Sequence, residues 1–105
     1  MIIVDERTYS CHPGKLGAFQ DVYETLGKPI QWPILGEPIG FFTTEVGELQ
    51  QVVHWWRYDS FADREERRAR LAAHPEWGTY LASALPLLAR MENRILTPLR
   101  FSPMK

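Results

Sequence analysis

The sequence of 105 residues contains only one cysteine and no excess of charge of either sign. A single cysteine excludes a scaffold held by internal disulfides and a zinc site built from several cysteines. Twelve basic and thirteen acidic residues give a formal net charge of −1, which excludes attachment to nucleic acids or membranes through bulk positive charge. Four tryptophans, four tyrosines and five phenylalanines are too many for a disordered chain of this length. We therefore expect residues 1–105 to form one small globular domain.

Long apolar runs are also absent. Residues 1–4 are apolar, but three charged residues follow at once, so no hydrophobic region of signal-peptide length is present. The uncharged stretch at residues 78–89 contains Pro86 and is too short to span a bilayer. We expect no stable membrane insertion and a cytoplasmic location, where a lone Cys11 would stay reduced.

The familiar motifs of cofactor and metal chemistry are missing. There is no phosphate-binding loop, dinucleotide fingerprint or nucleophile elbow. His12, His54 and His74 do not have the spacing of a metal-binding helix, and none is singled out as a haem ligand. The arginines of residues 64–70 are interleaved with two glutamates, which indicates a solvated helix face. We predict no cofactor, no metal and no nucleic-acid partner.

Alternating and β-branched patterns predict four strands, at residues 2–11, 34–44, 49–58 and 91–99. Apolar residues spaced three and four apart from Leu16 to Leu26 predict a first helix that ends at Gly27. Residues 31–33 then read as a loop, because Pro33 follows the short polar-aromatic stretch.

Two more helices are expected between the third and fourth strands. Ser60 is suited to cap the first of them, and Pro75 suits the first turn of the next. That last helix carries a clean apolar stripe from Trp77 to Leu88, and Pro86 is expected to end or kink it. The order β-α-β-β-α(α)-β predicts a ferredoxin-like α+β fold, with a four-stranded antiparallel sheet and helices on one face.

The third strand indicates how the other sheet face is covered. Its two alternating sets each contain a valine and a tryptophan, so neither set is polar. An aromatic face without helices would be an unusually large apolar patch on a monomer. The tail after Leu99 is too short to cover four strands. We therefore predict a homodimer in which two sheets pack face to face.

Several segments along the chain form a recognisable series. They are Arg7-Thr8-Tyr9 with Pro13-Gly14-Lys15, residues 36–47, residues 51–60 (QVVHWWRYDS), Arg64 to Arg68 with Leu71, Pro75-Glu76-Trp77, and residues 92–98. In order and spacing, and over nearly the whole chain, these segments resemble the NIPSNAP family. Glu6 and Trp55 depart from the pattern, where an apolar and an aliphatic residue are expected. The resemblance implies a dimeric α+β barrel. Related barrels include cofactor-free monooxygenases, haem proteins and isomerases, but the family itself implies no defined chemistry.

His54 is the candidate catalytic residue. If its set on the third strand faces the barrel interior, it lies beside Trp56 and Tyr58 in a partly apolar cavity. A neutral imidazole there could act as a general base, because burial lowers its pKa. The alternative is a histidine that is simply packed between two aromatic side chains.

Arg7 and Tyr9 share one face of the first strand with Asp5 and Cys11. Arg7 could bind a ligand carboxylate while Tyr9 donates a hydrogen bond. An Asp5–Arg7 ion pair is the structural alternative. Trp32, in its expected loop, either closes the cavity mouth or packs.

Three functions remain open from the sequence. The first is a homodimeric barrel that binds a small, partly apolar molecule, lined by His54, Trp56, Tyr58, Arg7 and Tyr9. The second is a cofactor-independent enzyme of the monooxygenase or isomerase type. The third is a protein-interaction module with a filled interior. An open cavity where His54 and Arg7 converge would favour the first two, and a packed interior would favour the third.

Overall fold

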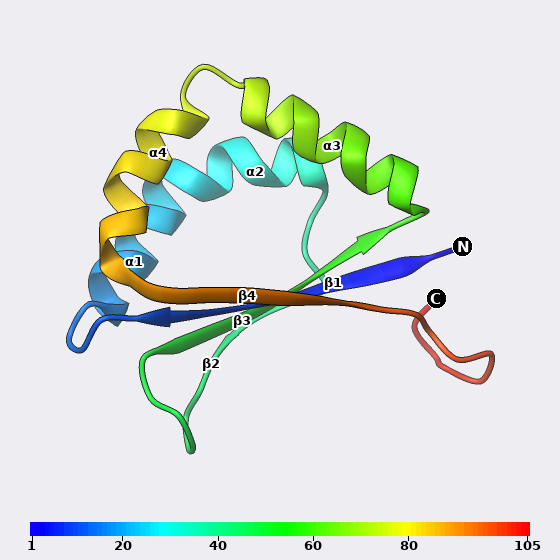
Figure 1. Ribbon diagram of the computed structural model, residues 1–105, viewed down its shortest axis with the longest axis horizontal. Coiled ribbons are helices and arrows are strands. Elements are labelled where there is room, and N and C mark those ends of the chain that lie inside the picture. Colours follow the sequence, from blue (N-terminus) through cyan, green and yellow to red (C-terminus); the bar gives the residue numbers. More distant parts are fainter.

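Four strands form one antiparallel sheet in the computed structural model, which describes all 105 residues (Figure 1). They are β1 (Ile3–Cys11), β2 (Gly40–Thr43), β3 (Gln51–Tyr58) and β4 (Leu88–Leu96). The strand order is β2-β3-β1-β4, so the long central strands β3 and β1 each pair on both sides. This order confirms the predicted ferredoxin-like α+β fold.

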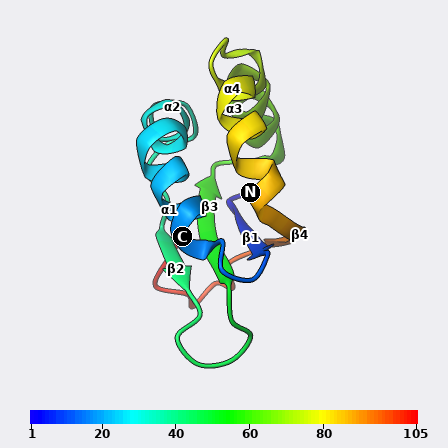
Figure 2. The same cartoon turned by 90° about the vertical axis from the view of Figure 1, so that its left-hand side faces the viewer.

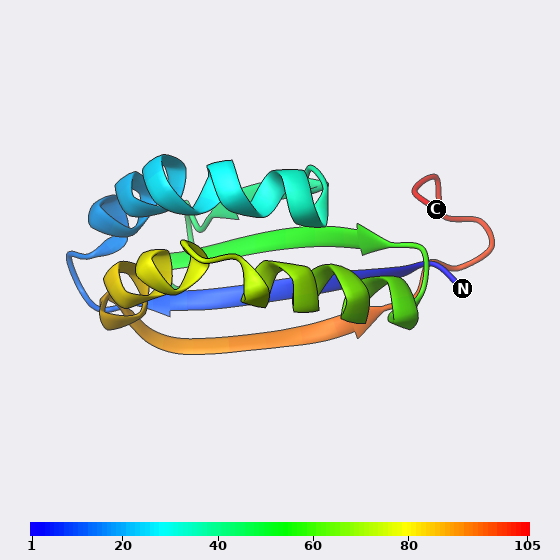
Figure 3. The same ribbon diagram turned by 90° about the horizontal axis from the view of Figure 1, so that it is seen from above.

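All the helices lie on one face of this sheet, in two neighbouring rows (Figure 2). One row is α1 (Leu16–Val22), a π-helical segment η1 (Tyr23–Gly27) and α2 (Lys28–Leu35). The other is α3 (Phe61–Ala73) and α4 (Trp77–Ala84), followed by a 3-10 turn η2 (Leu85–Leu87). Seen from above, α1 to α2 run along the β2–β3 side, and α3 and α4 run along the β1–β4 side (Figure 3).

The prediction that the first helix ends at Gly27 and that residues 31–33 form a loop is wrong. The chain remains helical through η1 into α2, with a proline in the first turn of α2 and Pro33 inside it. A proline is tolerated in a first turn, whereas Pro33 removes one internal hydrogen bond. Packing outweighs that loss, because Leu35 is buried in the core and Trp32 packs against it.

Strand boundaries also differ from the prediction. The second strand is only Gly40–Thr43, because the chain is still helical to Leu35 and Gly36 then adopts a positive φ of 91°. The third strand begins at Gln51 and the last at Leu88 rather than at residue 91. The cap was predicted correctly: the Ser60 hydroxyl accepts a hydrogen bond from the Asp63 amide at 3.0 Å.

Alternation along β3 decides which side chains lie under the helices. Val52, His54, Trp56 and Tyr58 are buried on the helix-covered face, and the three residues between them point to the open face. The His54 set therefore lies between the sheet and the helices of its own chain, not on the face expected to meet a second sheet. Trp56 and Tyr58 form the core with Ile3, Leu35 and Leu71.

Candidate functional site

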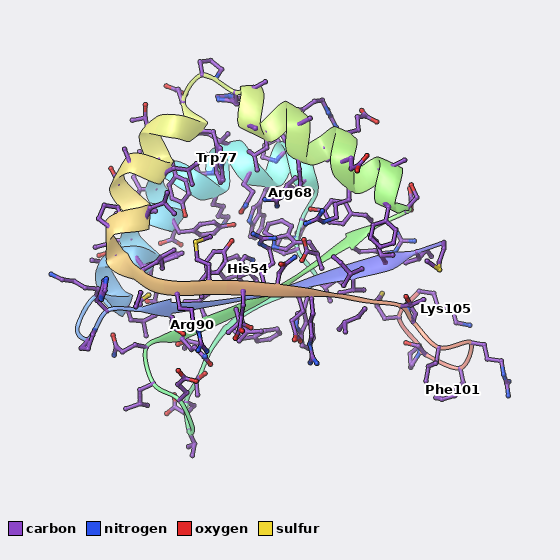
Figure 4. All side chains as sticks on the ribbon, in the orientation of Figure 1. His54, Arg68, Trp77, Arg90, Phe101 and Lys105 are labelled. Carbon is purple, nitrogen blue, oxygen red and sulfur yellow. The ribbon has the colours of Figure 1, made fainter.

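His54 lies at the centre of the sheet, with Arg7 of β1 and Phe41 of β2 as its cross-strand neighbours. It is 1% exposed, and Figure 4 shows it between the sheet and the helices. The Phe41 ring stacks on the imidazole at a centroid distance of 4.4 Å. The Tyr9 ring meets it edge-on at 4.7 Å. Two neighbouring strands thus hold the imidazole plane in a fixed orientation.

One nitrogen of His54 is engaged and the other is not. The Trp56 indole N–H donates a hydrogen bond of 2.6 Å to His54 Nδ1, whereas Nε2 is buried without a partner. Burial, reinforced by the charge of Arg7, lowers the pKa of His54 to about 3. His54 is therefore neutral at pH 7, and because Nδ1 accepts, its proton lies on Nε2.

This tautomer bears on the expected chemistry. A general base needs a free lone pair, and the only lone pair of the neutral ring is occupied by Trp56. His54 instead presents an unsatisfied N–H donor to its surroundings. The general-base role stays a prediction, and it requires Trp56 to give up this hydrogen bond.

Arg7 is engaged by a buried carboxylate of its own chain. Its guanidinium lies 3.3 Å from Asp5 Oδ2, and its Nε donates to the Tyr9 hydroxyl at 2.9 Å. Arg64 of α3 reaches the same carboxylate oxygen at 3.1 Å, and the Asn93 amide donates to the other oxygen at 3.0 Å. Burial would raise the pKa of Asp5, but the Asn93 hydrogen bond and the two arginines lower it overall.

This network is the ion-pair alternative foreseen for Arg7. It ties the helix α3 to strands β1 and β4 around a carboxylate that is 0% exposed. Removing one charged side chain from such a network leaves the remaining charges buried without a counter-charge, which lowers stability. The Tyr58 hydroxyl is also buried without a partner, and burial raises its pKa.

A small cavity of about 40 Å³ lies between the sheet, η1, α2 and α4. Most of its wall is aromatic and aliphatic, and no charged side chain lines it. The lining residues are Tyr9, Phe19, Tyr23, Gln31, Phe41, His54, Trp77, Tyr80, Leu81, Ala84, Leu85, Leu88 and Met91. Of the predicted site residues, only His54 and Tyr9 line it. Trp56 and Arg7 donate hydrogen bonds to these two, and Tyr58 lies in the core away from the cavity.

A surface groove of about 310 Å³ adjoins this cavity at the β2 edge of the sheet. The two spaces share Phe19, Tyr23 and Phe41 as walls. A π-helical segment, which often occurs at functional sites, begins at Tyr23.

The sequence prediction missed the polar side chains of this wall. Trp32 Nε1 donates to the Tyr23 hydroxyl at 3.0 Å, and that hydroxyl donates to Gln31 Oε1 through a short hydrogen bond. Burial raises the pKa of Tyr23, so the phenol remains protonated. Tyr23, Gly27 and Gln31 are spaced four residues apart and therefore lie on one helix face. The sequence contains this spacing, but it predicts a shared face only if the helix continues past Gly27.

No group of three or more His, Cys, Asp or Glu side chains converges as a metal-ligand set. None of the helices has the length and hydropathy needed to cross a bilayer.

The sheet order and the helices on a single face define the chain as a ferredoxin-like α+β domain with a small aromatic cavity. Known proteins identify it further. The NIPSNAP family model matches residues 4–103, and the chain belongs to this family.

Curated relatives agree. Protein NipSnap homolog of Dictyostelium discoideum is 34% identical over 94 residues, which cover 90% of this chain and 41% of that protein. Protein NipSnap homolog 3B of Homo sapiens is 38% identical over 90 residues, covering 84% of this chain and 34% of that protein. The chain therefore spans less than half the length of these relatives.

Solved structures match over the whole domain. A NIPSNAP family protein from Agrobacterium tumefaciens has a TM-score of 0.96 at 42% identity, with 100% of both chains covered. A NIPSNAP-like domain protein from Burkholderia xenovorans has a TM-score of 0.92 at 48% identity, covering 97% of this chain and 89% of that one. A Nitrosomonas europaea protein named as a candidate antibiotic biosynthesis monooxygenase has a TM-score of 0.67 at 13% identity, covering 96% and 93%, and shares the fold alone.

Proposed function

We propose that the protein binds a small, partly apolar molecule in the space between its helices and its sheet. The observation that carries this proposal is the buried Nε2–H of His54, a donor without an acceptor on a residue that lines an aromatic cavity. An unpaired buried donor costs stability, so its presence needs an explanation, and a ligand that supplies the acceptor is one. Aromatic walls with few polar groups are typical of small-molecule sites.

The ligand would occupy the cavity and the adjoining groove together. A cavity of about 40 Å³ holds only a few water molecules. The groove of about 310 Å³ supplies the volume of an ordinary ligand site once the shared rings turn aside. In this proposal Tyr9 and His54 contact the ligand, while Trp56 and Arg7 position them through their hydrogen bonds.

A matched pair of alanines on α4 tests the location. Ala84 is buried and lines the cavity, and Ala82 is exposed one half-turn away. Ala84→Val fills the cavity with two methyl groups, whereas Ala82→Val adds the same volume in solvent. Native mass spectrometry of freshly purified protein and ligand-observed NMR with small aromatic probes should show binding by the parent and by Ala82→Val, and a loss of about tenfold or more in Ala84→Val. Equal binding by both variants would place any ligand elsewhere.

A protein-interaction module is the second candidate, because the interior is mostly filled by side chains. The small cavity volume and the engagement of Arg7 by Asp5 favour it. If no probe binds to the parent protein at millimolar concentration, this candidate replaces the first.

We also propose that the functional unit is a homodimer joined through the open sheet faces. Trp55, Phe42 and Leu96 are apolar side chains on or beside that face, and Phe101 of the tail is 73% exposed. The tail lines an apolar groove of about 530 Å³ at one end of the sheet with Val4 and Trp55. Burying such groups on a second chain would favour association.

The open face is more polar than β3 alone suggested. Glu6 accepts hydrogen bonds from Trp55 Nε1 at 3.0 Å and from Arg94 Nε at 2.7 Å, so these polar groups are paired within the chain. A dimer interface there would combine apolar contacts with these paired charges. Sedimentation equilibrium at micromolar concentration should give the dimer mass, and a monomer would refute the proposal.

A further inference from the structure

We propose that the ligand of this cavity carries a carbonyl-type oxygen, which accepts hydrogen bonds from His54 Nε2–H and from the side-chain amide of Gln31. This inference rests on the proposed binding function and gives the ligand a chemical class. It follows from the direction of each hydrogen bond in the cavity wall.

The direction at His54 is fixed by Trp56. An indole nitrogen can only donate, so His54 Nδ1 must accept from it. A neutral imidazole has one donor and one acceptor nitrogen, and Nε2 is therefore left as a donor. That nitrogen is buried without a partner and points away from Nδ1, out of the contact with Trp56.

The direction at Gln31 is fixed in the same way by Trp32. The Trp32 N–H can only donate to the Tyr23 oxygen, so the Tyr23 hydrogen is free to go to Gln31 Oε1. The Gln31 carbonyl is thereby engaged, and its amide nitrogen makes no hydrogen bond within the protein. Gln31 is 7% exposed and lines the cavity.

Both chains of hydrogen bonds begin at a tryptophan N–H, and each ends in an unused donor on a residue that lines the same cavity. No carboxylate lines the cavity that could accept from a ligand cation. The hydroxyls of Tyr9 and Tyr80 can donate or accept and so impose no restriction. An apolar wall with neutral donors suits a neutral acceptor, since a fully charged anion would lose its hydration there.

Acetophenone and α-methylstyrene form a matched pair of probes, because they differ mainly in C=O against C=CH₂. The alkene leaves water more readily, so tighter binding of the ketone must come from contacts inside the site. We expect acetophenone to bind the parent protein about threefold to tenfold more tightly by NMR titration, the range that one or two net hydrogen bonds supply. The carbonyl ¹³C resonance of the bound ketone should lie downfield of its position in hydrocarbon solvent.

Gln31→Met in a Tyr23→Phe background keeps a similar side-chain volume and removes the amide donor without freeing the Tyr23 hydroxyl as a new one. Compared with Tyr23→Phe alone, this double variant should bring the ratio of ketone affinity to alkene affinity closer to one. The parent comparison needs no variant, so the inference stays testable if the double variant does not fold. Equal affinity for the two probes, or a carbonyl resonance unchanged from that in hydrocarbon solvent, overturns the inference but not the binding function. Failure of both probes to bind, or their undiminished binding to Ala84→Val, overturns the two together.

Discussion

Acidification should destabilise the protein through His54 well above the pH at which carboxylates titrate. Burial, together with the charge of Arg7, lowers the pKa of His54 from 6.5 to about 3. Between these values the unfolded chain holds a proton that the folded protein does not. The stabilising contribution of neutral His54 is therefore fully present above the unfolded pKa of 6.5. The free energy of unfolding falls as the pH drops below that value.

The size of the effect follows from the shift. Each pH unit inside this window removes at most about 1.4 kcal/mol, so lowering the pH from about 7 to about 4.5 should cost roughly 2–3 kcal/mol. Asp5 and Asp63 also have lowered pKa values. Their stabilising contributions are lost only below the ordinary aspartate pKa of 3.8, so they lie outside the window.

The assay is urea unfolding followed by tryptophan fluorescence at the two pH values, at one protein concentration. His54→Asn places an amide oxygen near the position of Nδ1, keeps an acceptor for Trp56 and cannot titrate. This variant should be less stable overall but should lose most of the pH dependence. His12→Asn, at an exposed turn, is the matched control and should keep it. The reasoning is refuted if the parent is equally stable at both pH values, or if His54→Asn keeps the full loss.

Four substitutions test the close packing, the buried ion network and the α3 cap by chemical denaturation. Gly27→Ala would place its Cβ 2.7 Å from Tyr80 Cε1, so it should lower the free energy of unfolding by about 1–3 kcal/mol. In the control Gly78→Ala the new Cβ meets no atom within 4 Å, so this variant should be more stable by about 0.5–1 kcal/mol. Equal effects of the two substitutions would contradict the close contact at Gly27. Asp5→Asn leaves two arginines without their carboxylate and should cost about 3–5 kcal/mol, and a loss under about 1 kcal/mol would show that the network contributes little. Ser60→Ala removes the α3 cap and should cost about 1 kcal/mol, with no change expected in probe binding.

The fold was readable from the sequence because most of its signals are local. Alternation in residues 51–58 predicted a strand, and the Ser60 cap with its apolar and charged pattern predicted α3. The order of these elements then allowed few arrangements, and the ferredoxin-like sheet was among them. The sharing of one β1 face by Asp5, Arg7 and Tyr9 also followed from alternation alone.

Tertiary packing decided what local signals could not. The sequence pattern predicted a loop at residues 31–33 and a strand from residue 34, yet burial of Leu35 and Gln31 makes residues 28–35, with their two prolines, a helix. Alternation divides β3 into two sets, but only the position of the helices determines that the His54 set is the covered one. Contacts between residues far apart in the sequence also determine the polarity of the site. Arg64, 59 residues along the chain from Asp5, contacts the same carboxylate as Arg7. The sequence by itself determined most of the helices and strands and their order, because backbone preferences act between near neighbours. Only the tertiary structure decided which polar atoms remain without a hydrogen-bond partner, because those partners lie far along the chain.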